Sequence, residues 1–243
     1  MEKDFENKLS ARPILLTAFS GISAFGIITV GAMLSAWFYS GRTNEPYSFF
    51  NHFISELGNK HYSSHAYFFN GAMLVGGIPV MIFMTGIYTL LSSRIRYAFV
   101  CTGLLSGVLC ILLGYYSSDH YDIHIKVALA QFNAMLLSSI LFSVAVLLER
   151  DRSYFNRWLA YAGALPIVCI ISFLSIEYTH QQDAKNGHMH QLLYHRPDFW
   201  PLPFMEWMVF FSLIGWVAII CVYLVYKAST SAQADAEYAV NRN

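Results

Sequence analysis

The chain has 243 residues, of which 56% are hydrophobic and only 12% are charged, with a net charge of zero and a mean hydropathy of +0.44. Soluble domains carry about 25% charged residues, so this composition excludes an ordinary soluble domain and indicates a polytopic membrane protein. Without a net positive charge or a polybasic stretch, nothing points to nucleic acid as a partner, and membrane lipids are the expected surroundings.

The sequence predicts a single all-α domain of six transmembrane helices. Each predicted span is an apolar segment of about 20 residues or more, the length needed to cross a bilayer. The predicted spans are 13–39, 66–91, 97–116, 125–148, 158–176 and 202–226, followed by a tail over 227–243. Pairs of small residues such as Gly103 and Gly107 predict close helix contacts within the bundle.

The distribution of basic residues predicts the orientation in the membrane. Ten of the 15 Lys and Arg residues fall at the end of the bundle that holds both termini. Because Lys and Arg near helix ends stay cytoplasmic, we expect cytoplasmic termini and three extracytoplasmic loops, in a bacterial inner membrane. All nine histidines lie in or beside those three loops, which suggests a chemical surface there. They are His52, His61, His65, His120, His124, His180, His188, His190 and His195.

The first of these loops contains an amphipathic segment, 47–58, with the sequence YSFFNHFISELG. A helix there would lie in the membrane interface or in the mouth of the bundle, with His52, Ser55 and Glu56 on its polar face. His52 and Glu56 are then either an exposed polar face or a second ligand or acid/base pair that faces Asp119 across the pocket. Ser55 could act as a nucleophile only beside a base.

The segment from Asp119 to His124 carries the clearest metal-binding pattern. His120 and His124 are four residues apart and therefore share a helical face, and Asp119 precedes them. Two imidazoles and a carboxylate could bind zinc or another divalent metal with an open position for water. The alternative is that His120 caps the helix. Gln131 continues the His124 stripe and predicts a polar seam facing the bundle interior.

Glu206 is an acid placed about one turn inside the last span, where an uncompensated charge costs roughly 2 to 3 kcal/mol. We expect a histidine, a metal or a water-filled mouth to compensate it, or an interfacial position exposed to water. Asn70, just inside the second span, either joins the same region or ties two helices together. The run from His188 to His195 either extends a metal site or is solvated.

The chain resembles the domain-of-unknown-function family 998 of polytopic membrane proteins, which is distantly similar to the Frag/DRAM/Sfk group. The matching motifs are ISELG at 54–58, FFNGAMLVGGIP at 68–79, the Asp119 to His124 segment and RPDFWPLPFMEW at 196–207. The resemblance implies a six-helix fold and marks Ser55, Glu56, Asp119 and His124 as positions that coincide with the family pattern. It implies no established reaction.

Three functions are compatible with these features. The first is a metal-dependent lipid hydrolase or lipid-modifying enzyme, with Asp119, His120 and His124 as ligands and Glu56 or Glu206 as base. The second is a non-enzymatic lipid-binding or regulatory protein. The third is a small-solute or ion transporter, although no inverted repeat is evident.

Overall fold

The computed structural model describes residues 11–149, 154–184 and 192–240, and within these ranges the chain folds into long α-helices. Six helices contain a segment long and apolar enough to cross a membrane, which confirms the expected architecture. The helices are α2 (Ala11–Trp37), α3 (Ala66–Leu90), α4 (Arg96–Tyr115), α5 (Tyr121–Leu148), α6 (Ala164–Ala184) and α8 (Pro201–Val240). The short 3₁₀ helices between them are η1 (Ile54–Gly58), η2 (Ser118–His120) and η3 (Arg157–Gly163).

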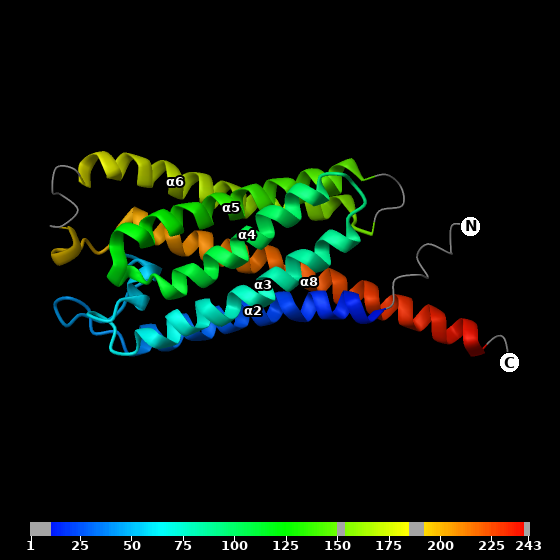
Figure 1. Cartoon of the computed structure of the whole chain (residues 1–243), viewed down its shortest axis with the longest axis horizontal. Helices are drawn as coiled ribbons and strands as arrows, with labels where there is room; N and C mark the ends of the chain where they lie inside the picture. The colour runs from blue at the N-terminus through cyan, green and yellow to red at the C-terminus, as the bar shows by residue number, and fades with distance from the viewer. Residues whose placement is uncertain (1–10, 150–153, 185–191, 241–243) are drawn as a thin grey trace.

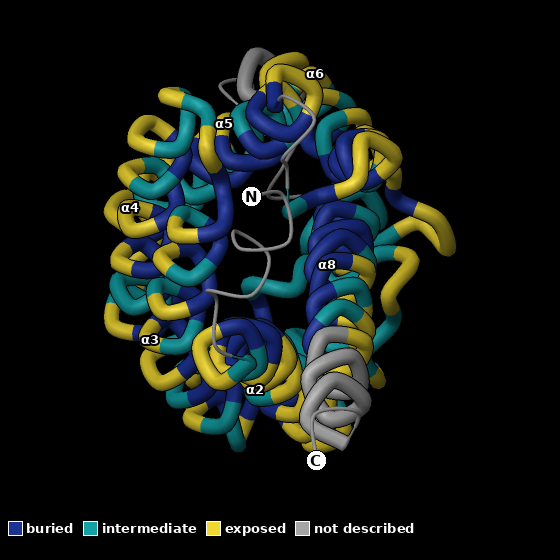
Figure 2. Tube along the Cα trace, turned by 90° about the vertical axis from the view of Figure 1, so that its right-hand side faces the viewer, coloured by how far each residue is buried: buried dark blue, intermediate teal, exposed yellow. Residues whose placement is uncertain are grey.

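The six helices form a closed ring when the bundle is viewed along its axis (Figure 2). Helices that follow one another in the chain lie side by side, and α2 contacts α8 to complete the ring. The short connections 91–95 and 116–120 make α3, α4 and α5 antiparallel neighbours, as in an up-and-down bundle. Buried residues face the inside of the ring, so the interior is built from one face of every helix.

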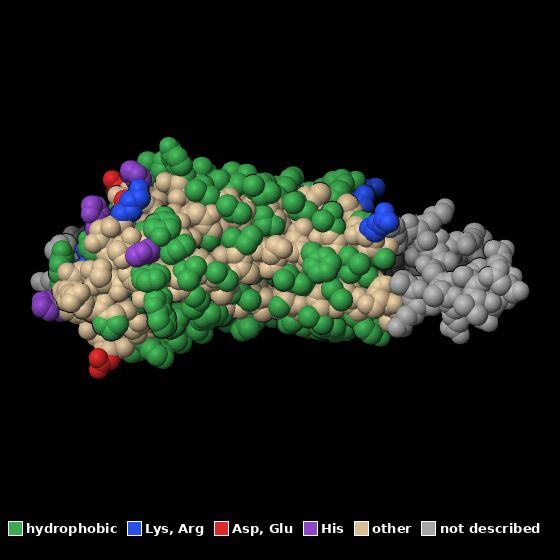
Figure 3. Space-filling model, turned by 90° about the horizontal axis from the view of Figure 1, so that it is seen from below, with side chains coloured by type: hydrophobic (Ala, Val, Ile, Leu, Met, Phe, Trp, Pro, Cys, Tyr) green, Lys and Arg blue, Asp and Glu red, His purple; other side chains and the backbone are tan. Residues whose placement is uncertain are grey.

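The two ends of the bundle differ in chemistry. Helix α2 begins and α8 ends at one end, while segments 38–65, 116–120 and 192–200 gather at the other, which we call the loop end (Figure 1). Hydrophobic side chains cover the middle of the face shown in Figure 3, and histidines and acids collect at the loop end. The protein is therefore an integral membrane protein whose apolar middle lies in lipid. The side of the membrane that the loop end faces stays a prediction from the charge distribution.

Helices α3 and α4 touch backbone to backbone at a pair of glycines. A Cβ added to Gly77 would lie 2.5 Å from the carbonyl oxygen of Gly107, and one added to Gly107 would lie 2.9 Å from the carbonyl oxygen of Gly77. These separations are too short for any side chain. Only glycine at both positions permits this helix spacing, as expected for small residues at membrane helix contacts.

We expect Gly77→Ala to lower the free energy of unfolding by about 1 to 3 kcal/mol, because the added methyl group forces the two helices apart. Gly71→Ala is the matched control. Gly71 lies on the same helix, and a Cβ added there would meet no neighbouring atom within 4 Å. Thermal unfolding of the purified variants in detergent measures the difference. Equal melting temperatures for the two variants would contradict the backbone contact.

The amphipathic helix expected over 47–58 is shorter than predicted, because only Ile54–Gly58 is helical and that segment is a 3₁₀ helix. Upstream side chains bond to the local backbone: the N–H of Phe50 donates to Ser48 Oγ (3.3 Å), and the N–H of Ser48 donates to His52 Nδ1 (3.3 Å). Such hydrogen bonds between side chains and the local backbone compete with the backbone hydrogen bonds of a helix. Helix η1 instead sits in the mouth of the bundle, against α2, α3 and α8.

The ends of α5, α6 and α8 also differ from the prediction. Helix α6 runs from Ala164 to Ala184, whereas the predicted span was 158–176. Helix α5 begins at Tyr121 rather than at 125, because the turn η2 leads directly into it. Helix α8 continues to Val240, whereas a tail was predicted from 227. Several alanines in this last segment favour helix over coil even though its hydropathy is low.

Candidate functional site

A buried ion pair lies at the centre of the loop end. Arg196 donates from Nη1 to Glu56 Oε1 (3.0 Å) and from Nη2 to Glu56 Oε2 (2.7 Å), the two-bond geometry that suits a guanidinium and a carboxylate. Their side chains are 7% and 8% exposed. A pair with so little access to water depends on full hydrogen bonding for its stability.

The remaining hydrogen bonds of Glu56 meet that requirement for the carboxylate, whereas Arg196 Nε is buried without a hydrogen-bond partner, 3.9 Å from Glu45 Oε1. Glu56 Oε1 accepts the backbone N–H of Phe53 (3.0 Å), and Glu56 Oε2 accepts the Tyr39 hydroxyl (2.9 Å). Burial raises the pKa of Tyr39, and the neighbouring Glu56 carboxylate raises it further. The phenol therefore stays protonated and remains a donor to Glu56.

The same arginine joins two distant parts of the chain into one structure, the loop cap, formed by residues 38–65 and 192–200. Arg196 Nη1 also donates to the carbonyl oxygen of Asn51 (2.9 Å), and Asn51 Nδ2 donates to that of Pro197 (2.9 Å). Trp207 on α8 donates from Nε1 to the Tyr47 hydroxyl (2.9 Å). These bonds hold the loop cap over the ends of the helices.

His52 is buried in the loop cap, with Nε2 3.5 Å from Glu45 Oε1. Glu45 accepts the backbone N–H groups of Arg42 (3.2 Å) and Thr43 (2.6 Å). Burial lowers the pKa of His52, and the positive charge of Arg196 lowers it further. Burial alone would raise the pKa of Glu45, but hydrogen bonds from Thr43 and the local backbone outweigh it and hold that pKa at about 2.

We expect the stability of the protein to fall as the pH drops below 6.5, the ordinary pKa of histidine. The folded state holds the pKa of His52 lower, so the unfolded chain binds more protons, and stability present above 6.5 is lost as pH falls through the folded pKa. Each unit of pKa difference corresponds to about 1.4 kcal/mol. Glu45, whose pKa is held at about 2 against an ordinary 4.5, adds a slope of the same sign only as the pH approaches 4.5.

The measurement is the melting temperature of purified protein between pH 4.5 and 8. His52→Gln should flatten the pH dependence, whereas His120→Gln, which alters an exposed histidine, should leave it unchanged. If the melting temperature depends on pH as steeply in His52→Gln as in the wild-type protein, a group other than His52 is responsible.

An inner cavity lies below the loop cap, inside the ring of helices. The space that the centre of a water molecule can occupy in this cavity is about 120 Å³. That is roughly ten times the 10 to 15 Å³ that one water needs. Its wall is almost entirely apolar. Residues that form this wall on five helices include Phe25, Ile28, Met73, Leu113, Phe132 and Leu213.

Polar side chains gather where the inner cavity approaches the loop end. Glu206 Oε2 accepts the backbone N–H of Ile54 (2.7 Å), and Asn70 Nδ2 donates to the carbonyl oxygen of Gly58 (2.9 Å). Ser55 on η1 lines the same cavity. The cavity is therefore apolar along most of its length and polar at one end.

His124 and Gln131 continue this polar lining down one face of α5. His124 Nδ1 lies 2.8 Å from the carbonyl oxygen of Tyr116. Because a carbonyl only accepts, Nδ1 carries the hydrogen, and Nε2 of the neutral ring is an acceptor. Gln131, two turns or about 10 Å deeper, donates from Nε2 to Ser106 Oγ on α4 (3.0 Å). The seam thus faces the bundle interior, as its spacing predicts.

A second space, the rim cavity, adjoins the inner cavity and measures about 130 Å³ by the same criterion. Both are lined by Ser55, Ser118, His124, Ala128, Phe132 and Glu206. The rim cavity also reaches Phe173 and Glu177 on α6 and Arg42 in the loop cap. The rim cavity is therefore a vestibule of mixed polarity between α5, α6 and the loop cap.

The structure divides the residues that the sequence singled out into two sites. Ser55, Asn70, His124, Gln131 and Glu206 line the inner cavity. His52 and Glu56 belong to the loop cap. Glu56 also lines the rim cavity, and it pairs with Arg196 instead of facing Asp119. Glu206 accepts a backbone N–H and lines both cavities, whereas its compensation by a histidine, a metal or a water-filled mouth stays a prediction.

The three proposed metal ligands contact different parts of the structure. Asp119 accepts the backbone N–H of Lys60 (3.0 Å) and the hydroxyl of Ser117 (2.9 Å), so it joins the loop cap to the end of α4. His120 is exposed and packs edge-on against Tyr116. Among the residues that the structure describes, no group of three or more His, Cys, Asp or Glu could hold a metal ion. Zinc binding by Asp119, His120 and His124 stays a prediction.

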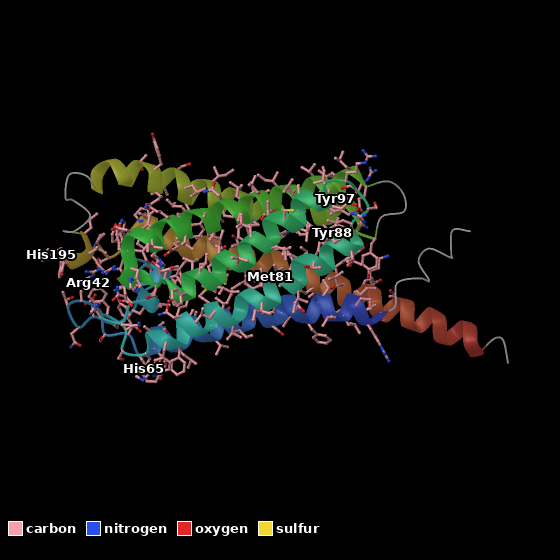
Figure 4. All side chains as sticks on the ribbon, viewed as in Figure 1. Arg42, His65, Met81, Tyr88, Tyr97 and His195 are labelled. Atoms are coloured by element: carbon pink, nitrogen blue, oxygen red, sulfur yellow. The ribbon has the colours of Figure 1, made fainter. Side chains whose placement is uncertain are left out.

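Of the histidine-rich run in the last loop, His188 and His190 lie outside the described residues. His195 is exposed at the loop end, as is visible in Figure 4. Sequence reasoning missed Arg196, Tyr39 and Trp207. The signal that could have found Arg196 is its place beside Pro197 in the RPDFW segment, but no spacing connects it to Glu56, 140 residues away.

Comparison with known proteins places most of the chain in one family. The family described as "Protein of unknown function (DUF998)" matches residues 27–223, which include every helix of the ring in whole or in part. No curated protein and no solved structure matches the chain.

Proposed function

The chain belongs to the DUF998 family of proteins of unknown function, and since the family supplies no activity, we propose from the cavity geometry that the protein binds a single-chain amphiphile. The hydrocarbon chain would occupy the inner cavity. Its head would lie at the polar end, beside Ser55, His124 and Glu206. Ligand pockets in proteins have this character, mostly apolar with a few convergent polar groups.

The proposal rests on the contrast between the apolar wall of the inner cavity and its polar end. Polar side chains inside a membrane are expensive and normally mark a functional site. Here they come from η1, α3, α5 and α8, which are distant in the chain, and they converge on one apolar space. A structural tie between two helices needs no cavity of this size.

The rim cavity supports a route for the ligand. Phe132 on α5 and Phe173 on α6 pack with ring centroids 4.6 Å apart below it. Nearer the loop end, the rim cavity is lined by Tyr121 and Ile125 of α5 and by Glu177 of α6. A lipid could therefore enter between α5 and α6 from the surrounding leaflet.

Filling the cavity tests the proposal. We expect Ala128→Phe to weaken binding of a fluorescent long-chain probe at least tenfold, because the added ring occupies space shared by both cavities. Ala130→Phe is the matched control: Ala130 is two residues away on α5 and exposed on the outside of the bundle. The measurement is probe titration of purified protein in nanodiscs, with melting temperatures confirming that both variants fold.

Equal binding by Ala128→Phe and Ala130→Phe would contradict the proposal. If Ala128→Phe fails to fold, Ala128→Leu, a smaller intrusion, replaces it. Native mass spectrometry of the wild-type protein provides an independent check, since a bound amphiphile should co-purify with it and be absent from the cavity-filled variant.

Lipid hydrolysis is the second candidate, supported by the presence of Ser55 and His124 on the same two cavities. His124 Nε2 would take the Ser55 hydroxyl proton as the oxygen attacks an ester carbonyl, and would return it to the departing alcohol. Water would then release the acyl group. Labelling by a fluorophosphonate probe that is lost in Ser55→Ala would support this candidate, and its absence in the wild-type protein would oppose it.

A further inference from the structure

We infer that the head group of the bound amphiphile donates hydrogen bonds, as a hydroxyl or an amine does, and is not an anion such as a carboxylate or a phosphate. This inference rests on the proposed function and specifies its ligand class. It follows from the charges and the hydrogen-bonding capacity of the side chains around the inner cavity.

The first argument is charge. Among the described residues that line the inner cavity, Glu206 is the one carboxylic acid, and neither lysine nor arginine is present. Arg42 reaches only the rim cavity, where its Nη1 donates to the Tyr62 hydroxyl (2.7 Å) and its guanidinium lies 4.0 Å from the centre of the Tyr62 ring. Arg196 is bound to Glu56. An anionic head in the inner cavity would therefore find no cation in the described lining, which is unfavourable where water is scarce.

The second argument is the orientation of His124. Its Nδ1–H is directed to the carbonyl oxygen of Tyr116, which fixes the tautomer and leaves Nε2 able only to accept. His124 lines both cavities. A ligand hydroxyl or ammonium group can donate to Nε2, whereas a carboxylate cannot.

The third argument is the unused acceptor of Gln131. Its Nε2 donates to Ser106 Oγ, and its Oε1 is buried without a hydrogen-bond partner. A buried acceptor without a partner costs about 1 to 3 kcal/mol. With His124 Nε2, this oxygen gives the inner cavity two acceptors at different depths, which a ligand with hydrogen-bond donors would satisfy.

The test compares three ligands of the same chain length: a long-chain alcohol, a long-chain amine and a fatty acid. Each competes with the fluorescent probe for the full-length protein in phosphatidylcholine nanodiscs, at a pH where the fatty acid is ionised. We expect the alcohol or the amine to compete at least tenfold more strongly than the fatty acid. The difference between alcohol and amine shows whether the head is neutral or cationic.

Replacing the acid at Glu206 provides the second arm. Glu206→Gln keeps an oxygen for the N–H of Ile54 but cannot give up a proton to an amine and pair with the ammonium ion that results, so amine binding should fall, with little change for the alcohol. Glu149→Gln is the matched control. Glu149 is also buried and accepts one backbone N–H, from Ser92 (2.6 Å), but it lies at the opposite end of the bundle and lines neither cavity.

The outcomes separate this inference from the proposed function. Fatty acid binding as strong as that of the alcohol and the amine would overturn the donor-head inference while leaving amphiphile binding intact. No binding of any of the three ligands, or of the probe, would overturn both. The ligand series uses the wild-type protein, so the inference can be refuted even if Glu206→Gln does not fold.

Discussion

Replacing Arg196 with methionine should lower the free energy of unfolding by about 3 to 5 kcal/mol, because it leaves the carboxylate of Glu56 buried without its cation. The pair is enclosed, with both side chains less than a tenth exposed. Arg94→Met, which removes an exposed arginine, should have an effect within about 0.5 kcal/mol. Thermal and denaturant unfolding in detergent measure the difference.

A double substitution distinguishes the loss of an interaction from the exposure of an orphaned charge. Arg196→Met combined with Glu56→Leu should be markedly more stable than Arg196→Met alone, since buried ion pairs can often be replaced by apolar residues of similar size. If the two single effects simply add, Arg196 and Glu56 do not interact energetically. That result would contradict the central role of this pair in the loop cap.

Trp207→Ala should cost about 3 to 5 kcal/mol, the usual effect of removing a large aromatic side chain from a core. Trp207 is fully buried on α8, and Tyr47 and Phe49 pack against its ring. Trp207→Phe should cost less, about 1 to 3 kcal/mol, because it removes mainly the Nε1–H donor and leaves the Tyr47 hydroxyl without it. The difference between the two variants separates packing from hydrogen bonding.

The matched control is Trp158→Ala, which removes a tryptophan that is 49% exposed at the opposite end of the bundle. It should cost well under half as much as Trp207→Ala. Proteolysis within residues 38–65 provides a second readout, because loss of Trp207 should loosen the loop cap while the helices stay folded. Equal sensitivity of Trp207→Ala and Trp158→Ala to protease would contradict this anchoring role.

Much of the fold could be predicted from the sequence because the signals are local. An apolar run of about 20 residues has few alternatives to a membrane-spanning helix, in which every backbone polar group is bonded within the segment. The seven-residue step from His124 to Gln131 similarly predicts one polar face. The position of Glu206 inside a span predicts that its carboxyl group needs a partner, but it does not indicate which one.

The contacts of the candidate site could not be predicted to the same extent. Glu56 was expected to act as a base or to face Asp119, but the bundle brings Arg196 to it from 140 residues away. Asp119 and His124 are close in sequence, yet they bond to different parts of the structure. Helical spacing places residues on a face, and it says nothing of which loop packs over that face.

The sequence by itself determined the membrane environment, the six crossings and the polar faces, because each depends on the hydrophobicity and periodicity of a short stretch of chain. The tertiary structure alone decided which polar groups meet. It paired Glu56 with Arg196, gave Glu206 the backbone N–H of Ile54 and left an apolar cavity beneath them. These depend on how helices and loops far apart in the chain fill space together, which no local pattern encodes.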